Sequence, residues 1–537
     1  MALGNKKGCM IMENNFNKLG VMIDCSRNAV MNIGSLKKFM TLIKKMGYNQ
    51  VHLYMEDTYE INFDKHFGYL RGRYTKKELK ELDDFAFNLG IELVPNIQTL
   101  AHMTAYTRWC NDIIDTDDIL LVGNDKVYDL IKDIFTTLRE CFRTENIHIG
   151  MDEAFMLGRG KYYDLFGAKD RFEILLSHLN KVCDIAKSTG FKPMMWSDMF
   201  YRIANGGEYY EASSKFDKSI KNQIPADLTL VYWDYYHTDF NTYDRMLKGH
   251  NQLSDNVIFA GGAWKWAGFT PNNYFSLSTL KPAIKACNKN GVKDIFITMW
   301  GDNGAECSAF SVLPSLCYAS CLVQDITKIS DIKQKFKEWV GVSFDDFMLL
   351  DLPNKLDIVK TPVNPSKYFL YGDCFMSIFN SQEKPEYKDK YVSFARKLKY
   401  AVNRTSEYSY LFDTLSKLCN VLAIKQDICS RTRQAYKNKE LLDGVISDYR
   451  KMIKRTEEFY LAFRNQWYKE NKPFGFEIHD ARLGGLIHRM KSCLNRLIEF
   501  KEGKIANIPE LEEDLLSVGD KLFTDNEWKG LVSTSVM

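Results

Sequence analysis

Long hydrophobic runs are absent from this sequence. No stretch of about 18 apolar residues, the length that a transmembrane helix needs, occurs in the 537 residues, so we expect no membrane-spanning segment. The opening residues, MALGNKKGCMIMENNF, also lack the apolar core of a signal peptide. The net charge of +3 is too close to balance to indicate nucleic acid or an anionic membrane as the main partner. These absences predict a cytoplasmic protein that binds neither nucleic acid nor a membrane.

Sequence patterns that hold common cofactors are also missing. The sequence contains neither GxxxxGKS/T nor GxGxxG, the glycine-rich loops that bind phosphates and dinucleotides. The 13 cysteines are odd in number and scattered through apolar segments, which is not the arrangement of a disulfide framework. Cys317 and Cys321 lie four residues apart on a predicted helix, but no second pair of ligands accompanies them. We therefore expect reduced thiols, no metal and no organic cofactor.

Short β-like runs alternate with helix-like segments between about residues 18 and 325. The β-like runs are KLGVMIDCS, QVHLYME, IELVPNIQ, NIHIGMDE, KPMMWSDM, LTLVYWDY, VIFAGGAW and DIFITMWG. Several of them are almost continuously apolar, as expected for parallel strands that are buried on both faces. This alternation predicts a (β/α)8 TIM barrel. A doubly wound open sheet is the alternative, and the count of eight strands favours the barrel.

The β-like runs fade after about residue 325. Helical spacing dominates the segments from Lys384 to Tyr436, from Lys439 to Glu470 and from Asp480 to Glu502. The stretch DLPNKLDIVKTPVNPSKYFLYGD carries three prolines and is predicted to be a connecting loop. We therefore predict two domains, a catalytic barrel over residues 1–325 and an α-helical C-terminal domain over residues 326–537.

A charged group or a tryptophan lies at or shortly after the end of every predicted strand. The chemistry of a TIM barrel lies at the carboxyl ends of its strands, so these side chains are expected to meet there. Carboxylates and an arginine can bind hydroxyl groups, while indole faces can cover an apolar C–H surface. A sugar ring offers both kinds of surface. The strand ends include Arg27, Glu56, Gln98, His102, Asp152, Glu153, Trp196, Asp198, Tyr235, Trp266, Trp300 and Asp302.

The stretch ENIHIGMDEAFM places two carboxylates, Asp152 and Glu153, side by side at the end of the fourth strand. Adjacent acids do not easily flank one anomeric carbon, as the usual two-carboxylate mechanism of glycoside hydrolysis requires. They suit substrate-assisted hydrolysis, in which one acid protonates the leaving oxygen and the other holds the N–H of the substrate's 2-acetamido group. A helix N-cap is the simpler interpretation of Asp152. The position at a strand end favours an active site.

Several motifs resemble those of the family 20 glycoside hydrolases, the β-N-acetylhexosaminidases. HIGMDE resembles the His-x-Gly-x-Asp-Glu motif of that family, and MIDCSR is similar to its first-strand Asp-x-x-x-Arg element, with shorter spacing. PNIQTLAH and MMWSDM resemble the third- and fifth-strand elements. MWGD resembles the last-strand Trp-x-Glu, with Asp302 in place of Glu. The C-terminal part resembles the helical domain of a compact bacterial subgroup of the family.

The resemblance implies a role for each candidate residue. Glu153 would be the general acid and then the base, and Asp152 would hold the acetamido N–H. The family's seventh-strand Tyr-Leu-Asp is absent, since GGAWKWAG stands there, so the tyrosine that holds the acetamido oxygen is predicted to be Tyr235, with Tyr236 and Tyr232 as alternatives. The residues implied in substrate binding are Arg27 at O3 and O4, His102 near Glu153, Trp196, Trp233 and Trp300 around the acetamido group and sugar face, Trp266 on the leaving-group side, and Asp302 at O4 and O6.

The resemblance thus implies an exo-β-N-acetylhexosaminidase that removes terminal β-linked GlcNAc or GalNAc with retention. Its partners would be glycans or oligosaccharides with these terminal sugars. Two alternatives stay open: a carbohydrate-binding protein that has lost catalysis, and an enzyme of the same family that releases a disaccharide. The sequence does not decide the oligomeric state, and a homodimer is compatible with it.

Overall fold

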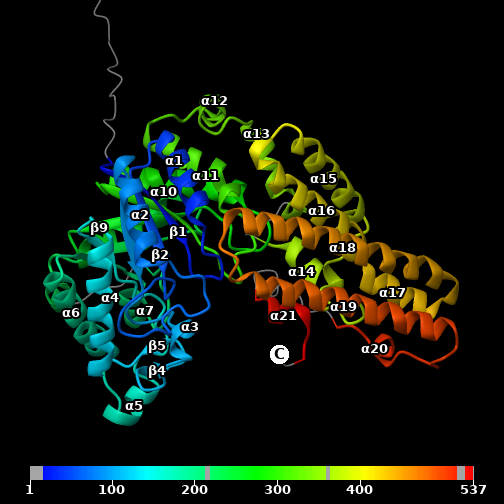
Figure 1. The fold of residues 1–537 in the computed structure, drawn as a ribbon, viewed down its shortest axis with the longest axis horizontal. Coiled ribbons are helices and arrows are strands. Elements are labelled where there is room, and N and C mark those ends of the chain that lie inside the picture. Colours follow the sequence, from blue (N-terminus) through cyan, green and yellow to red (C-terminus); the bar gives the residue numbers. More distant parts are fainter. Residues whose placement is uncertain (1–15, 212–217, 358–362, 517–526, 536–537) are drawn as a thin grey trace, which may run out of the picture.

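The chain folds around a closed barrel of eight parallel strands (Figure 1). This computed structural model describes residues 16–211, 218–357, 363–516 and 527–535, so the N-terminal segment considered above as a signal peptide lies largely outside the described residues. Around the barrel the strand order is β1-β10-β9-β8-β7-β6-β3-β2. The prediction of a TIM barrel is confirmed, and the open sheet is excluded. The barrel strands are β1 (Lys18–Asp24), β2 (Gln50–Met55), β3 (Glu92–Ile97), β6 (Asn146–His148), β7 (Lys192–Trp196), β8 (Thr229–Trp233), β9 (Val257–Gly262) and β10 (Asp294–Met299).

The pairing of the first strand with the last closes the barrel and aligns their carboxyl ends. The register runs from Lys18 opposite Asp294 to Ile23 opposite Met299. The Asp24 carboxylate then accepts a hydrogen bond from the backbone N–H of Gly301, at 2.9 Å. Because of this register, the loop after β1 and the loop after β10 meet at one edge of the catalytic face.

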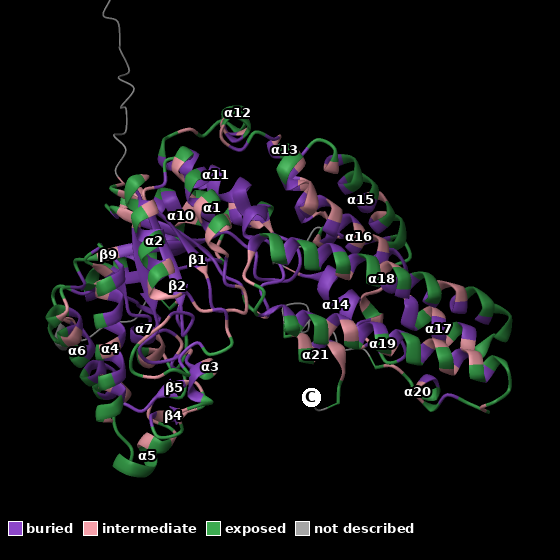
Figure 2. Cartoon of the chain, viewed as in Figure 1, coloured by how far each residue is buried: buried purple, intermediate pink, exposed green. Residues whose placement is uncertain are grey.

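Helices pack outside the strands and bury their apolar sides against them (Figure 2). The predicted helices form, and α2 begins with a capping box in which Thr75 and Glu78 exchange hydrogen bonds. Shorter elements that were not predicted lie in the loops, including a two-stranded sheet of β4 (Ile114–Thr116) and β5 (Ile119–Leu120). The helices of this part are α1 (Ile33–Lys45), α2 (Lys76–Asn88), α3 (Thr104–Thr107), α4 (Asp125–Cys141), α5 (Lys161–Phe166), α6 (Arg171–Ser188), α7 (Asp198–Ala204), α8 (Lys218–Gln223), α9 (Phe240–Leu253), α10 (Asn273–Lys289), η1 (Ala309–Val312) and α11 (Leu313–Val323).

The C-terminal part is helical, as predicted, and extends away from the barrel (Figure 1). The boundary at residue 325 stays a prediction, because α11 and α12 pack against each other across it. The C-terminal helices are α12 (Ile329–Val340), α13 (Phe344–Phe347), η2 (Met348–Asn354), α14 (Pro365–Tyr371), η3 (Asn380–Gln382), α15 (Tyr387–Val402), η4 (Ser406–Tyr408), α16 (Ser409–Lys425), α17 (Ile428–Lys437), η5 (Lys439–Leu441), α18 (Leu442–Glu470), α19 (Phe476–Lys501), α20 (Pro509–Glu512) and α21 (Trp528–Val532).

The predicted connecting loop is partly wrong. Helix α14 occupies its second half, and all seven residues of α14 are buried. Pro365 stands at the start of this helix, where its fixed φ fits and its missing N–H leaves no bond unmade. Pro365, which contributed to the prediction of a loop, therefore begins a helix. Residues 358–362 of the stretch lie outside the described residues.

Two further expectations concern the whole chain. Among the described residues, no helix is both long and apolar enough to cross a lipid bilayer. The 12 cysteines in this part of the chain are unpaired thiols, and eleven of them are buried. Cys317 and Cys321 lie inside α11, and no cluster of three or more metal-binding side chains occurs within the described ranges.

Candidate active site

A pocket of about 490 Å³ opens at the carboxyl ends of the barrel strands. It brings together all ten of the site residues predicted from the sequence, and Tyr236 as well. Asp302 and Tyr236 are exposed at this pocket, whereas most of the other lining side chains are buried. The lining residues are Arg27, His102, Asp152, Glu153, Trp196, Trp233, Tyr235, Tyr236, Trp266, Trp300 and Asp302.

An unusual backbone turn follows β6 and presents the two adjacent acids. Gly150, Met151 and Glu153 have φ values of 74°, 69° and 51°, in the left-handed region that residues with a side chain rarely adopt. A Cβ at Gly150 would lie 2.1 Å from Gln98 Oε1, so only glycine fits there. Strained backbone of this kind concentrates at functional sites. The turn is what allows neighbouring carboxylates to enter one pocket.

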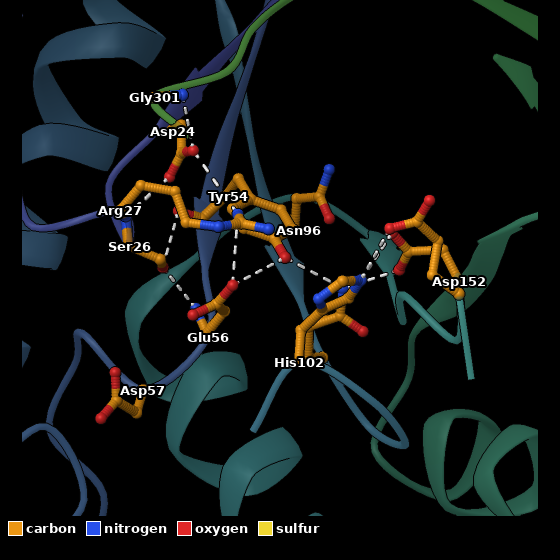
Figure 3. Close-up of polar contacts among 12 residues, drawn as sticks. Asp24, Ser26, Arg27, Tyr54, Glu56, Asp57, Asn96, His102, Asp152 and Gly301 are labelled. Carbon is orange, nitrogen blue, oxygen red and sulfur yellow. Dashed lines mark hydrogen bonds and ion pairs between the residues drawn. The ribbon is translucent and has the colours of Figure 1, made fainter. Parts of the chain in front are cut away.

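Asp152 is buried and held as a carboxylate. Its Oδ1 accepts a hydrogen bond from Gln98 Nε2 at 2.7 Å, and its Oδ2 lies 3.2 Å from His102 Nε2 (Figure 3). Burial alone would raise the pKa of Asp152, but the charge of His102 and these polar contacts outweigh it and lower the pKa below the usual value. Asp152 therefore stays ionised at neutral pH.

His102 faces both acids from the loop after β3. Its Nε2 lies 3.8 Å from Glu153 Oε2, in addition to its contact with Asp152. Burial would lower the pKa of His102, but the Asp152 carboxylate raises it, with a smaller contribution from Glu56, to about 9. The ring is therefore an imidazolium at neutral pH, and it places a positive charge between the two carboxyl groups.

The pKa of Glu153 is shifted in the opposite direction to that of Asp152. Burial and the neighbouring negative charge of Asp152 raise the pKa of Glu153, against the lowering effects of His102 and Arg202. Arg202 Nη2 lies 3.5 Å from Glu153 Oε1. The backbone N–H of Glu153 donates to the fully buried Asp198 carboxylate at 3.1 Å. The surroundings thus shift the pKa values of the two adjacent acids in opposite directions, down for Asp152 and up for Glu153.

Arg27 reaches across the pocket floor from the loop after β1. Its Nη1 lies 3.2 Å from Glu56 Oε1 (Figure 3). Its guanidinium packs over the rings of Tyr54 at 5.1 Å and Trp300 at 5.3 Å. These contacts fix the plane of the guanidinium, and N–H donors that are not used by Glu56 and Asp24 stay free for a ligand.

Indole and phenol rings form the remaining walls. Trp233 stacks on Tyr235 with ring centroids 5.3 Å apart, and Trp266 meets the edge of Tyr235 at 5.6 Å. Trp196 is almost fully buried between His148 and Trp300, and its Nε1–H has no protein acceptor among the described residues. The walls therefore offer apolar ring faces with a few polar atoms between them, which suits a sugar with an acetamido group.

The three tyrosines considered from the sequence occupy different positions relative to the pocket. Tyr235 is buried and lines the pocket, and its backbone oxygen accepts a hydrogen bond from Trp264 Nε1 at 2.8 Å. Tyr236 also lines the pocket but is half exposed. Tyr232 lies outside the pocket lining, since its ring packs against His250 and its hydroxyl donates to Asp234. Of the three, only Tyr235 and Tyr236 line the pocket, and which of them holds the acetamido oxygen stays a prediction.

Comparison with protein families assigns both parts of the chain. A family model described as the glycosyl hydrolase family 20 catalytic domain matches residues 16–253, and one described as the glycoside hydrolase 20C C-terminal domain matches residues 345–527. The chain belongs to glycoside hydrolase family 20. The catalytic match ends before β9 and β10, the two strands at which this family-20 chain carries GGAWKWAG and Asp302 instead of the usual motifs.

Individual relatives of this family-20 chain are distant. Hexosaminidase D from Bos taurus is 23% identical over 251 residues, which are 43% of this chain and 65% of that protein. A β-hexosaminidase from Akkermansia muciniphila is 24% identical over 265 residues, which are 41% of this chain and 53% of that protein. The structure of a GH20 exo-β-N-acetylglucosaminidase from Vibrio harveyi aligns with a TM-score of 0.47 and 15% identity, over 63% of this chain and 58% of that one. The chain thus spans between about half and two thirds of the length of these relatives.

Sequence reasoning left three supporting residues out of the family-20 site. Gln98 and Asp198 appear at the predicted strand ends but not among the candidate site residues, and Arg202 on α7 gives no signal in the sequence. Their position in the structure shows what they do: Gln98 holds Asp152, while Asp198 and Arg202 hold Glu153. A polar residue that directly follows a buried strand was the available signal for Gln98.

Proposed function

We propose that this family-20 chain is an exo-β-N-acetylhexosaminidase, which removes terminal non-reducing β-linked GlcNAc or GalNAc from glycans and oligosaccharides with retention of configuration. One observation carries the proposal: the adjacent acids Asp152 and Glu153 share one pocket wall and have pKa values that are shifted in opposite directions. This pattern supports two different roles for the two carboxyl groups, as substrate-assisted hydrolysis requires.

In the first step the substrate supplies the nucleophile. The carbonyl oxygen of its 2-acetamido group attacks the anomeric carbon, while protonated Glu153 gives its proton to the glycosidic oxygen and the bond to the leaving group breaks. The acetamido nitrogen becomes more positive as the oxazolinium ring closes. The Asp152 carboxylate, fixed by Gln98 and His102, accepts the N–H of that group and stabilises the developing charge.

In the second step water opens the oxazolinium. Glu153, now a carboxylate, takes a proton from the water as its oxygen attacks the anomeric carbon from the face that the leaving group left. The bond between the anomeric carbon and the oxazolinium oxygen breaks, and the acetamido group is restored. Two inversions give net retention. The raised pKa of Glu153 suits this cycle, because the group must be protonated at the start of each turnover.

The other lining residues would hold the sugar in place. Arg27 has free donors suited to the neighbouring O3 and O4 hydroxyls, and Asp302 could accept from O4 and O6. Trp196, Trp233 and Trp300 supply ring faces for the acetamido methyl group and the sugar ring. Tyr235 is the better placed of the two lining tyrosines to donate to the acetamido oxygen, because it is buried beside Trp233 and Trp266.

Hydrolysis of an aryl β-GlcNAc, with the product anomer followed by NMR, tests this proposal. We expect release of β-GlcNAc as the first product. Binding of GlcNAc without turnover would favour the inactive carbohydrate-binding protein. Failure on the aryl monosaccharide with release of a disaccharide from longer chains would favour the disaccharide-releasing enzyme. Parallel kinetics on aryl β-GalNAc would decide the preference at O4.

A further inference from the structure

Three ring side chains outside the pocket pack against one another on the protein surface. His66 and Trp109 stack with ring centroids 5.3 Å apart and planes 21° apart, and Tyr69 meets Trp109 edge-on at 5.8 Å. Tyr69 and Trp109 are nevertheless 47% and 45% exposed. We call His66, Tyr69 and Trp109 the aromatic platform. Single exposed rings are common on soluble proteins, whereas a contiguous exposed cluster of rings is typical of a binding surface.

Hydrogen bonds through Asp64 connect the two loops that carry the aromatic platform. Asp64 accepts from the backbone N–H of His66 at 2.8 Å, and its Oδ1 lies 3.1 Å from His66 Nδ1. The same carboxylate accepts from the Tyr106 hydroxyl at 3.0 Å, which ties the loop of His66 to the segment of Trp109. These bonds hold His66 and connect the two loops that carry the rings, which lowers the entropic cost of binding a ligand there.

The platform lies on the same side of the barrel as the pocket. His66 and Tyr69 belong to the loop between β2 and α2, and Trp109 to the segment between β3 and α4, so both follow carboxyl ends of barrel strands (Figure 1). Trp109 is seven residues beyond His102, and α3 lies between them. Three helical and four extended steps give a separation of at most about 19 Å between these two Cα atoms.

The loop of the platform is also attached to the pocket floor. Arg71 Nε donates to Asp57 Oδ1 at 2.8 Å, and Arg71 Nη2 donates to the backbone oxygen of Ser26 at 2.7 Å. Ser26 directly precedes Arg27 of the pocket. The bond to Ser26 joins the loop after β2 to the loop after β1, so the loop that carries His66 and Tyr69 is connected to the loop that carries Arg27.

The chemistry of the platform fits a sugar better than an aliphatic protein side chain. The negative faces of the rings attract the C–H faces of a pyranose, and the polar edges of the Tyr69, His66 and Asp64 side chains can exchange hydrogen bonds with its hydroxyls. We propose that the aromatic platform binds a further sugar residue of the substrate, on the leaving-group side of the bond that is cut. This inference rests on the proposed function, since an enzyme that removes a terminal sugar meets the rest of the glycan on that side.

A double variant that removes the platform tests the inference. Tyr69→Ala with Trp109→Ala deletes two of the three rings and touches no residue of the pocket. The matched control is Phe87→Ala with Tyr400→Ala, which deletes two rings on α2 and α15 that are even more exposed, at 64% and 63%. We would measure kcat/KM for aryl β-GlcNAc and for oligosaccharides of increasing length with a terminal β-GlcNAc. Circular dichroism melting would verify the fold of each variant.

We expect kcat/KM of the platform variant to fall about tenfold, or about 1.4 kcal/mol, on the oligosaccharides and to stay unchanged on the aryl sugar. The control variant should behave as the wild type on both. An equal loss on both substrates, or no loss on either, would overturn the inference. So would a dimer of the wild type that the double variant abolishes in light scattering, because the platform would then be a protein interface.

The inference can fail separately from the proposed function. If the wild type does not hydrolyse aryl β-GlcNAc, the proposed function fails, and the platform is tested by calorimetric binding of the same oligosaccharides. Weaker binding by the platform variant than by the control variant supports a sugar site. Equal binding by the two variants contradicts it.

Discussion

Lys367 and Glu306 form an ion pair that is sealed from solvent, with Nζ and Oε2 2.9 Å apart and the two side chains 0% and 1% exposed. Lys367 belongs to α14 of the helical part, and Glu306 to the loop after β10, four residues beyond Asp302. Arg482 of α19 adds a second cation, 3.2 Å from Glu306, and donates to the backbone oxygen of Asn303 at 2.7 Å. The helical part thus holds the loop that carries one wall of the pocket.

Replacing Lys367 with Met should weaken the folded state. Removal of one partner leaves the buried Glu306 carboxylate short of a counter-charge, so we expect the free energy of unfolding in urea to fall by about 3 kcal/mol. Lys192→Met is the matched control, because Lys192 pairs with Glu145 on the surface and its side chain is 69% exposed. The control should change stability by less than about 1 kcal/mol. Equal effects would show that the buried pair contributes no more than a surface pair.

Glu153→Gln should separate substrates by the quality of their leaving groups. A poor leaving group needs the proton of Glu153, so we expect kcat to fall roughly 10²–10⁴-fold on oligosaccharides and much less on an activated aryl substrate. Glu145→Gln serves as the control, since Glu145 is an exposed acid just before the same strand. An equal loss of kcat on both substrates would show that Glu153 is not the general acid.

Asp152→Asn should lower kcat without changing the shape of the pocket. The amide keeps an oxygen for the acetamido N–H but loses the negative charge that stabilises the oxazolinium, and we expect a loss of roughly 10²–10³-fold. An N-acetyl thiazoline, which mimics that intermediate, should inhibit the wild type tightly and the variant weakly. A normal kcat, or a thiazoline that does not bind the wild type, would indicate a protein nucleophile.

His102→Gln should move the pH profile of kcat/KM toward higher pH. The imidazolium lowers the pKa values of both Asp152 and Glu153, so its removal raises both and shifts both limbs upward. The stability difference between wild type and variant has a pH dependence of its own. The folded-state pKa of His102 is raised from 6.5 to about 9, so its contribution is complete below pH 6.5 and is lost as the pH rises through about 9. An unchanged pH profile of kcat/KM would show that the charge of His102 does not lower the pKa values of Asp152 and Glu153.

The barrel and most of its site could be predicted because the strands are apolar runs with abrupt polar ends. A strand end determines which residues reach the catalytic face, and this placed Arg27, Asp152 and Trp300 without any knowledge of the tertiary structure. It does not determine which way a side chain points once the strand has ended. Tyr232 still lies inside β8 and packs into the core, whereas Tyr235 follows the strand, and the course of the loop turns it into the pocket.

The sequence did not predict helix α14 or the supporting residue Arg202, and the two failures have related reasons. Pro365 signals a turn or a first helical residue equally well, and the burial of the seven residues of α14 is decided by helices more distant in sequence. Arg202 acts on Glu153 from a helix that begins after the next strand, β7. Contacts of this kind depend on how helices pack over the barrel, which local sequence patterns do not contain.

A substitution at Gly150 would disturb the packing of the turn and, through it, the protonation of a buried carboxylate. Any side chain there would push away the Gln98 amide, and that amide is the group that donates to Asp152. A methyl group with no charge of its own would thus make the buried carboxylate easier to protonate. The first symptom of such a substitution would be lost activity on the acid side of the pH profile, in a protein whose barrel is still intact.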